Sequence, residues 1–110
     1  MSKLAQYDPQ SNAAYVHFSS HKAWETMEIN QHLNVDLDKQ GHIVGIELLD
    51  VRRFIQQIFG SDPTPEKIKS LKIEVCSETG EEVVLRMNYT NEQVLYAIPK
   101  SYTSPLVAGA

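Results

Sequence analysis

The stretch from residue 34 to residue 50 constrains the fold of this chain more than any other part of the sequence. Apolar and polar residues alternate on both sides of Gly41, which is the pattern of two strands that each keep one face in water. A shift of one residue would turn one apolar row toward the solvent, so the alternation predicts a two-residue loop, either Gln40–Gly41 or Lys39–Gln40. A symmetric three-residue loop would put the two apolar rows on opposite faces. Gly41 supplies the positive φ angle that a tight loop needs.

Further alternating segments lie on both sides of this hairpin and predict about seven strands in total. The expected strands are 14–19, 23–29, 33–38, 43–49, 71–76, 83–88 and 94–98. The first four are expected to form an antiparallel meander, preceded by a turn at residues 7–12. Strands that cluster around one helix, instead of alternating with helices, indicate an α+β fold with a mostly antiparallel β-sheet.

One central amphipathic helix is expected from Val51 to Phe59, because its apolar residues recur at helical spacing. Asp50 is a good N-cap residue and Gly60 a good residue for the position after the helix. Beyond the helix, Thr64 is expected to cap a short helical turn that begins at a proline.

Length and composition predict one soluble domain. The chain has 110 residues, of which 42% are hydrophobic and 22% charged, as is ordinary for a globular protein with one core. We expect a single domain over residues 1–100 and a flexible tail over 101–110. The sequence has no apolar run long enough to span a membrane, and its net charge of −4 does not favour nucleic acid. The single cysteine excludes an internal disulfide, so we expect a cytoplasmic protein of bacterial style.

Four segments of the sequence together resemble the DUF2283 family, small bacterial proteins of unknown function. The segments are Tyr7-Asp8-Pro9, Asn12-Ala13-Ala14-Tyr15-Val16, Asn34-Val35-Asp36-Leu37-Asp38 and Gly41-His42-Ile43-Val44-Gly45-Ile46-Glu47-Leu48-Leu49. The resemblance covers about residues 4–52, and residues 60–100 add C-terminal strands outside it. Asn12 departs from the family pattern, which often has Asp at this position. The resemblance implies no activity, but it suggests a small accessory or regulatory protein, of a kind that is in some cases encoded beside a toxin-like partner.

The first candidate site is the polar face of the hairpin. Asn34, Asp36 and Glu47 are expected on the same side, and Gly45 leaves a gap beside Asp36. Two carboxylates and an amide near a gap are suited to hold a cation or to act as acid and base. The alternative is a solvated sheet face on which the glycine permits a twist or the close packing of another segment.

The remaining reactive side chains do not form a recognisable catalytic or metal motif. The four histidines lack metal-ligand spacing, and Cys76 lies beside acidic residues that do not favour a thiolate. We therefore expect no metal, no cofactor and no catalytic residues. Trp24, Arg52 and Arg53 are candidate contacts for a protein partner, although the arginines are also suited to a solvated helix face that pairs with Asp50 or Glu47.

The leading functional interpretation is a non-enzymatic interaction or regulatory module that self-associates, most simply as a homodimer, because the strands are short and have open edges. Two alternatives remain open. One is a small metal-dependent enzyme, such as a hydrolase, that uses Asp36 and Glu47. The other is an antitoxin-like partner of a neighbouring gene product.

Overall fold

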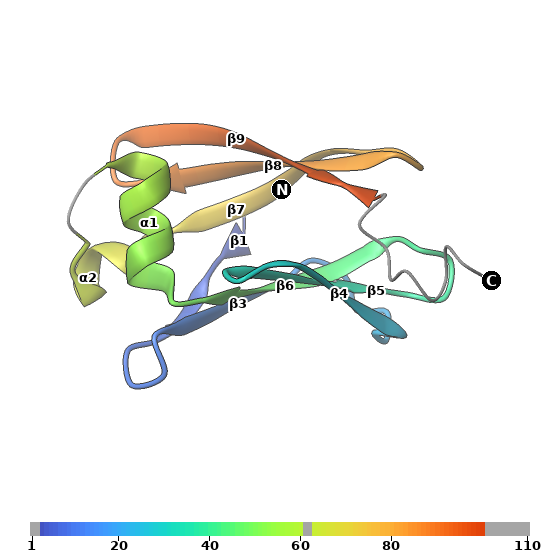
Figure 1. Cartoon of the computed structure of the whole chain (residues 1–110), viewed down its shortest axis with the longest axis horizontal. Helices are drawn as coiled ribbons and strands as arrows, with labels where there is room; N and C mark the ends of the chain where they lie inside the picture. Colours follow the sequence, from blue (N-terminus) through green and yellow to red (C-terminus); the bar gives the residue numbers. More distant parts are fainter. Residues whose placement is uncertain (1–2, 61–62, 101–110) are drawn as a thin grey trace.

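The computed structural model describes residues 3–60 and 63–100, which form two antiparallel β-sheets packed face to face with a helix at one end (Figure 1). The α+β class and the antiparallel character are therefore confirmed, but the described residues contain nine strands, not seven. The strands are β1 (Lys3–Leu4), β2 (Gln6–Asp8), β3 (Ala13–His17), β4 (Glu25–Asn30), β5 (Leu33–Leu37), β6 (Ile43–Leu49), β7 (Lys72–Glu78), β8 (Glu82–Tyr89) and β9 (Glu92–Pro99). The predicted tail at 101–110 lies outside the described residues.

The five-stranded sheet has the order β2-β3-β6-β5-β4. The expected meander of the first four strands is therefore wrong at its start, because β3 pairs with β6 and not with β4. The connection from β3 to β4 crosses to the far edge of the sheet, and β4, β5 and β6 then return as consecutive hairpins. Alternation along a strand identifies its faces but carries no information on its neighbours, and this is why the sequence did not reveal the order.

The predicted two-residue loop of the β5–β6 hairpin is also wrong. Leu37 pairs with Ile43, as a longer loop requires, but Asp36 pairs with Gly45, so Val44 is an extra residue between the two pairs. Such a β-bulge changes the parity of the strand by one residue. It keeps the apolar residues of β5 and β6 on the same face, which is the condition from which the shorter loop was inferred.

The four-stranded sheet has the order β1-β7-β8-β9, and the three predicted C-terminal strands lie in it as consecutive antiparallel neighbours. The two-residue strand β1 joins its edge through pairs with Lys72 and Ile73. The chain then passes through Ala5, which is buried, into β2 of the other sheet. Residues 3–8 thus connect the two sheets. Strands of two and three residues are too short to give a recognisable alternation in the sequence.

The hydrophobic core lies between the two sheets, and both contribute to it. One cluster of buried side chains includes Leu33, Ile46 and Leu48 from the first sheet and Leu85 and Met87 from the second. The strands outside the DUF2283 resemblance therefore cover the apolar face of the strands inside it.

Helix α1 (Val51–Phe59) closes one end of the sandwich rather than lying at its centre (Figure 1), and a second helix, α2 (Pro65–Ile68), follows it. The predicted caps at Gly60 and Thr64 are confirmed. Gly60 has φ 71° and donates to the Gln56 carbonyl, and the Thr64 hydroxyl accepts from the Lys67 amide.

Asp50 precedes α1 as expected, but its side chain caps no helical amide and its backbone is left-handed, with φ 49°. Asn12 caps the helix instead. Its carbonyl accepts from the Val51 amide at 3.0 Å and its side-chain oxygen from the Arg52 amide at 3.2 Å. The Asn12 amide group also donates to the Asp50 carboxylate at 3.1 Å. A residue of the β2–β3 turn therefore fixes the start of the helix, a contact across 38 positions.

Candidate functional site

The predicted polar patch lies on the outer face of the five-stranded sheet, where its side chains bond to one another. Asn34 donates to the Glu47 carboxylate at 3.1 Å. Asp36 accepts from the Tyr15 hydroxyl at 2.9 Å with one oxygen and from the Thr26 hydroxyl at 2.6 Å with the other. Both carboxylate oxygens of Asp36 are therefore engaged by neighbouring strands.

The expected gap at Gly45 is filled by the Tyr15 side chain. A Cβ atom built on Gly45 would lie 2.3 Å from the Tyr15 hydroxyl oxygen, closer than any such contact allows. Burial, followed by the hydrogen bond to Asp36, raises the pKa of Tyr15 to about 12, so the phenol remains a donor over the ordinary pH range. The glycine thus permits the close approach of a side chain and leaves no space for a cation beside Asp36.

The histidines are distributed over the molecule. His32 is buried and its Nδ1 lies 3.0 Å from the Leu49 carbonyl, whereas His17, His21 and His42 are exposed at separate places. Within residues 3–60 and 63–100, no group of three or more His, Cys, Asp or Glu side chains is placed so as to hold a metal ion. Cys76 is exposed on β7, at an irregularity in its pairing with β8.

The tip of the β5–β6 hairpin is organised by Asp38. The Gly41 amide donates to the Asp38 carbonyl at 3.0 Å and Gly41 has φ 82°, which gives a three-residue loop that ends in a left-handed residue. One carboxylate oxygen of Asp38 accepts from the amides of Gln40 and His42, and the other lies 3.2 Å from Nδ1 of His21. The His42 amide bond, which contributes most, lowers the pKa of Asp38 despite its burial.

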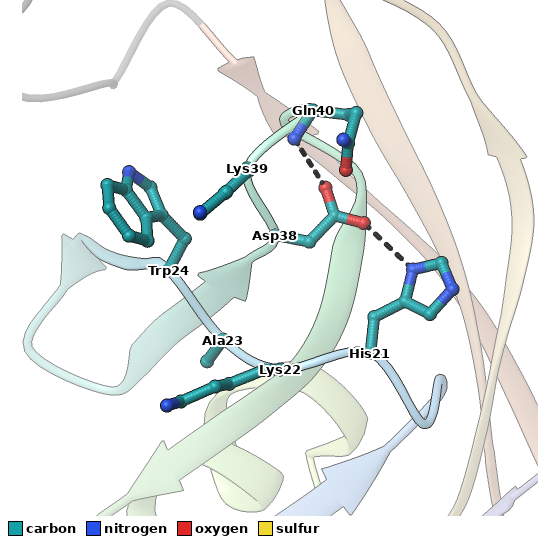
Figure 2. A pocket seen from close by; sticks show the side chains of 7 residues that line it. All are labelled: His21, Lys22, Ala23, Trp24, Asp38, Lys39 and Gln40. Atoms are coloured by element: carbon teal, nitrogen blue, oxygen red, sulfur yellow. Dashed lines mark hydrogen bonds and ion pairs between the residues drawn. The ribbon is translucent and has the colours of Figure 1, made fainter.

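Beside this tip is a hollow of about 470 Å³ that the sequence did not predict. The segment from His21 to Trp24 lines one side and the segment from Asp38 to Gln40 lines the other (Figure 2). Trp24 is 67% exposed, and Nζ of Lys39 lies 4.6 Å from the centre of its ring. The sequence offered Trp24 as a candidate contact for a partner, but only the fold shows that it is exposed and brings the two segments together.

The other side of the same tip is fastened to the four-stranded sheet. The carboxylate of Glu78 accepts from the Ile43 amide and from Nζ of Lys100, both at 3.0 Å, and His42 Nδ1 lies 3.5 Å away. Lys100 also donates to the Gly41 carbonyl at 3.3 Å. The hairpin tip is thus anchored at its base and exposes its Trp24 side.

The two arginines of α1 lie apart from both of these places. Arg52 and Arg53 are exposed, and Nε of Arg53 lies 3.6 Å from the Asp50 carboxylate in an exposed ion pair. Exposed pairs of this kind stabilise a protein by less than about 1 kcal/mol. The structure does not bring these arginines to the hollow at Trp24.

The outer edge of β9 is a further surface with unusual composition. No described strand pairs with its outer side, and the seven residues from Gln93 to Pro99 carry no charge. Leu95 is 62% exposed, although it is a large apolar residue in the middle of a strand. All eight residues of β9 pair with β8 in continuous register, so the strand is regular along its length.

Residues 5–52 match the model of the DUF2283 family, whose description is a protein of unknown function. The resemblance inferred from the four sequence segments is thus confirmed, and the rest of the chain is an extension beyond the match. Searches of curated proteins and of solved structures gave no match. Within the described residues, no helix is long and apolar enough to cross a membrane.

Proposed function

We propose that this protein is a non-enzymatic interaction module that forms a homodimer through β9, a strand of the extension beyond the DUF2283 segment. The observation that carries the proposal is the outer edge of this strand, which no described strand covers and which has seven consecutive uncharged residues and an exposed Leu95. The backbone N–H and C=O groups of an edge strand are a template for another strand.

In the five-stranded sheet, by contrast, the edge strand β4 has features that protect it from pairing. This strand contains Glu25 and Glu28, and its pairing shifts register between Glu28 and Asn30. Charges and irregularities of this kind discourage edge-to-edge pairing. Asn30 donates to the Tyr96 hydroxyl at 3.2 Å, so β4 and β9 lie on the same side of the molecule, one closed to pairing and the other open.

A second copy fits the β9 edge because an antiparallel pair of identical strands is self-complementary about a two-fold axis. Pairing of two β9 strands would join two four-stranded sheets into one sheet of eight. Leu95 lies near the middle of the strand and would approach the same region of its copy. Removal of one such side chain from water stabilises by about 1.5 to 3 kcal/mol.

Size-exclusion chromatography with light scattering tests the dimer. We expect a mass near twice 12.5 kDa at micromolar concentration for the natural protein and near 12.5 kDa for Leu95→Lys, whose charges would meet across the axis. Leu4→Lys is the matched control, because Leu4 is a 55% exposed leucine on the other edge of the same sheet. A natural protein that is monomeric at every concentration, or a Leu95→Lys variant that remains dimeric, would contradict the proposal.

The alternative of a metal-dependent enzyme has less support, because Asp36 uses both oxygens in hydrogen bonds and Tyr15 fills the space beside it. Titration with magnesium, manganese, calcium and zinc, followed by calorimetry and by the melting temperature, tests it. An antitoxin-like role predicts a second protein that co-purifies with this one from its native lysate. We place the module in the bacterial cytoplasm, since its single cysteine requires no oxidising compartment.

A further inference from the structure

We propose that the hollow beside the β5–β6 tip binds a short acidic peptide, with one apolar side chain against Trp24 and carboxylates on Lys22 and Lys39. This surface is separate from the proposed dimer edge, since its lining residues come from positions 21–24 and 38–40 and none belongs to β9. Peptide binding at the hollow therefore does not require the dimer.

Trp24 supplies a preformed apolar platform. Its backbone amide donates to the Leu37 carbonyl at 2.7 Å, which holds the residue against β5 while its side chain remains 67% exposed. Exposed tryptophans of this kind are enriched at protein contacts, because they supply a large contact area with little loss of conformational freedom. The volume of about 470 Å³ is that of a site for one or a few side chains.

The charges on the hollow select an anionic partner. Lys22 and Lys39 come from the two segments that line the hollow, and Figure 2 shows both side chains turned toward the side on which Trp24 lies. Asp38 is the one carboxylate among the described lining residues, and its oxygens already accept from two backbone amides and face His21. A partner's carboxylates thus meet two ammonium groups and little opposing charge, in a chain whose net charge is −4.

The surroundings favour a short peptide over a nucleic acid strand. Glu25 and Glu28 lie on the adjacent edge strand β4, so a polyanion that continues along this edge would meet like charges. A peptide of a few residues can end before it reaches them. Its apolar side chain would also bury part of the Trp24 ring that Lys39 leaves open.

Trp24 is the single tryptophan of the chain, so its fluorescence reports on the hollow directly. The probe is a blocked pentapeptide of sequence Asp-Glu-Leu-Asp-Glu, compared with Lys-Lys-Leu-Lys-Lys. We expect a saturable change in emission with the acidic peptide only, weakening as salt is added. The double variant Lys22→Glu with Lys39→Glu should raise its Kd at least roughly tenfold, whereas Lys69→Glu, at an exposed lysine that caps the C-terminal end of α2 and does not line the hollow, should leave it unchanged.

The same titration contains the results that would overturn the proposal. No change in emission up to about 1 mM peptide means that the Kd exceeds about 1 mM and that the hollow does not bind this class of ligand. Equal binding of the basic peptide, or unchanged binding by the double variant, would show that the lysines do not select the partner. Tighter binding of a ten-nucleotide oligothymidine would assign the site to nucleic acid. A concentration-dependent emission shift without peptide, retained in Leu95→Lys, would assign it to a second copy of the chain.

Discussion

The outer faces of the two sheets differ in how they use their polar residues. On the five-stranded sheet, side chains from the two strands β3 and β4 donate to Asp36 of β5, and Tyr15 lies over Gly45. On the four-stranded sheet, Arg86 and Glu74 form one ion pair across β7 and β8, next to an open edge with an exposed leucine. The residues that carry the DUF2283 pattern thus build and fix the first face, whereas the extension carries the surface suited to assembly.

Gly45→Ala is expected to have the largest effect on the outer face of the five-stranded sheet. The new Cβ would meet the Tyr15 hydroxyl at 2.3 Å and the Val16 carbonyl at 2.9 Å, so the phenol must leave and the strands must shift. We expect a loss of about 2 to 3 kcal/mol in the free energy of unfolding, measured by urea denaturation. Gly80→Ala is the control, because nothing lies within 4 Å of its Cβ, and it should change stability little.

A second change, Tyr15→Phe, separates the two causes of that loss. If the hydroxyl oxygen is the main obstacle, Gly45→Ala should cost less in the Tyr15→Phe background than in the natural chain, a coupling visible in a double-mutant cycle. Additive effects would mean that the backbone contact with Val16 dominates and that the face does not depend on the Tyr15–Asp36 hydrogen bond.

Asp38 provides the next test, because it holds the hairpin tip on which the hollow depends. Its pKa is lowered in the folded state, so its ionised form adds stability above the unfolded-state pKa near 3.9, and this contribution is lost as the pH falls through the folded-state value. Asp38→Asn should lower the melting temperature by roughly 5 °C at pH 6. The curves of the two proteins should converge as the pH approaches 2.5, whereas a difference that does not depend on pH would show that the charge of Asp38 is unimportant.

Much of the local structure was predictable from the sequence. The strands of the central hairpin, the helix from Val51 to Phe59 and the cap at Gly60 follow from spacing and from glycine chemistry, which act over a few residues. The loop length was not predictable, because a bulge at Val44 gives the same alternation of faces as a shorter loop. The sheet order and the hollow at Trp24 depend on pairings between distant segments, which alternation does not encode.

The cap of α1 also depends on a contact between distant segments, here through the single residue Asn12. A substitution at Asn12 is expected to change the free energy of unfolding less than the substitutions above. The sequence suggested Asp50 as the helix cap, but only the fold places Asn12 at the start of α1. Asn12→Asp keeps the acceptor for the Arg52 amide and loses the donor to the Asp50 carboxylate. We expect a loss of about 1 kcal/mol at pH 7, since two carboxylates would then face each other. Recovery in the double variant with Asp50→Asn, measured by urea denaturation, would show that this repulsion is the cause.

The smallest expected effect concerns the ion pair of the other sheet. Arg86 is 40% exposed, so water screens its attraction to Glu74, and Arg86→Gln should cost at most about 0.5 to 1 kcal/mol. The loss should shrink further in 0.5 M salt, in contrast to the loss from Gly45→Ala, which is steric and insensitive to salt. If Arg86→Gln cost as much as Gly45→Ala in the same urea titration, the outer faces of the two sheets would be equally structural. The division between a fixed face in the DUF2283 segment and an open one in the extension would then fail.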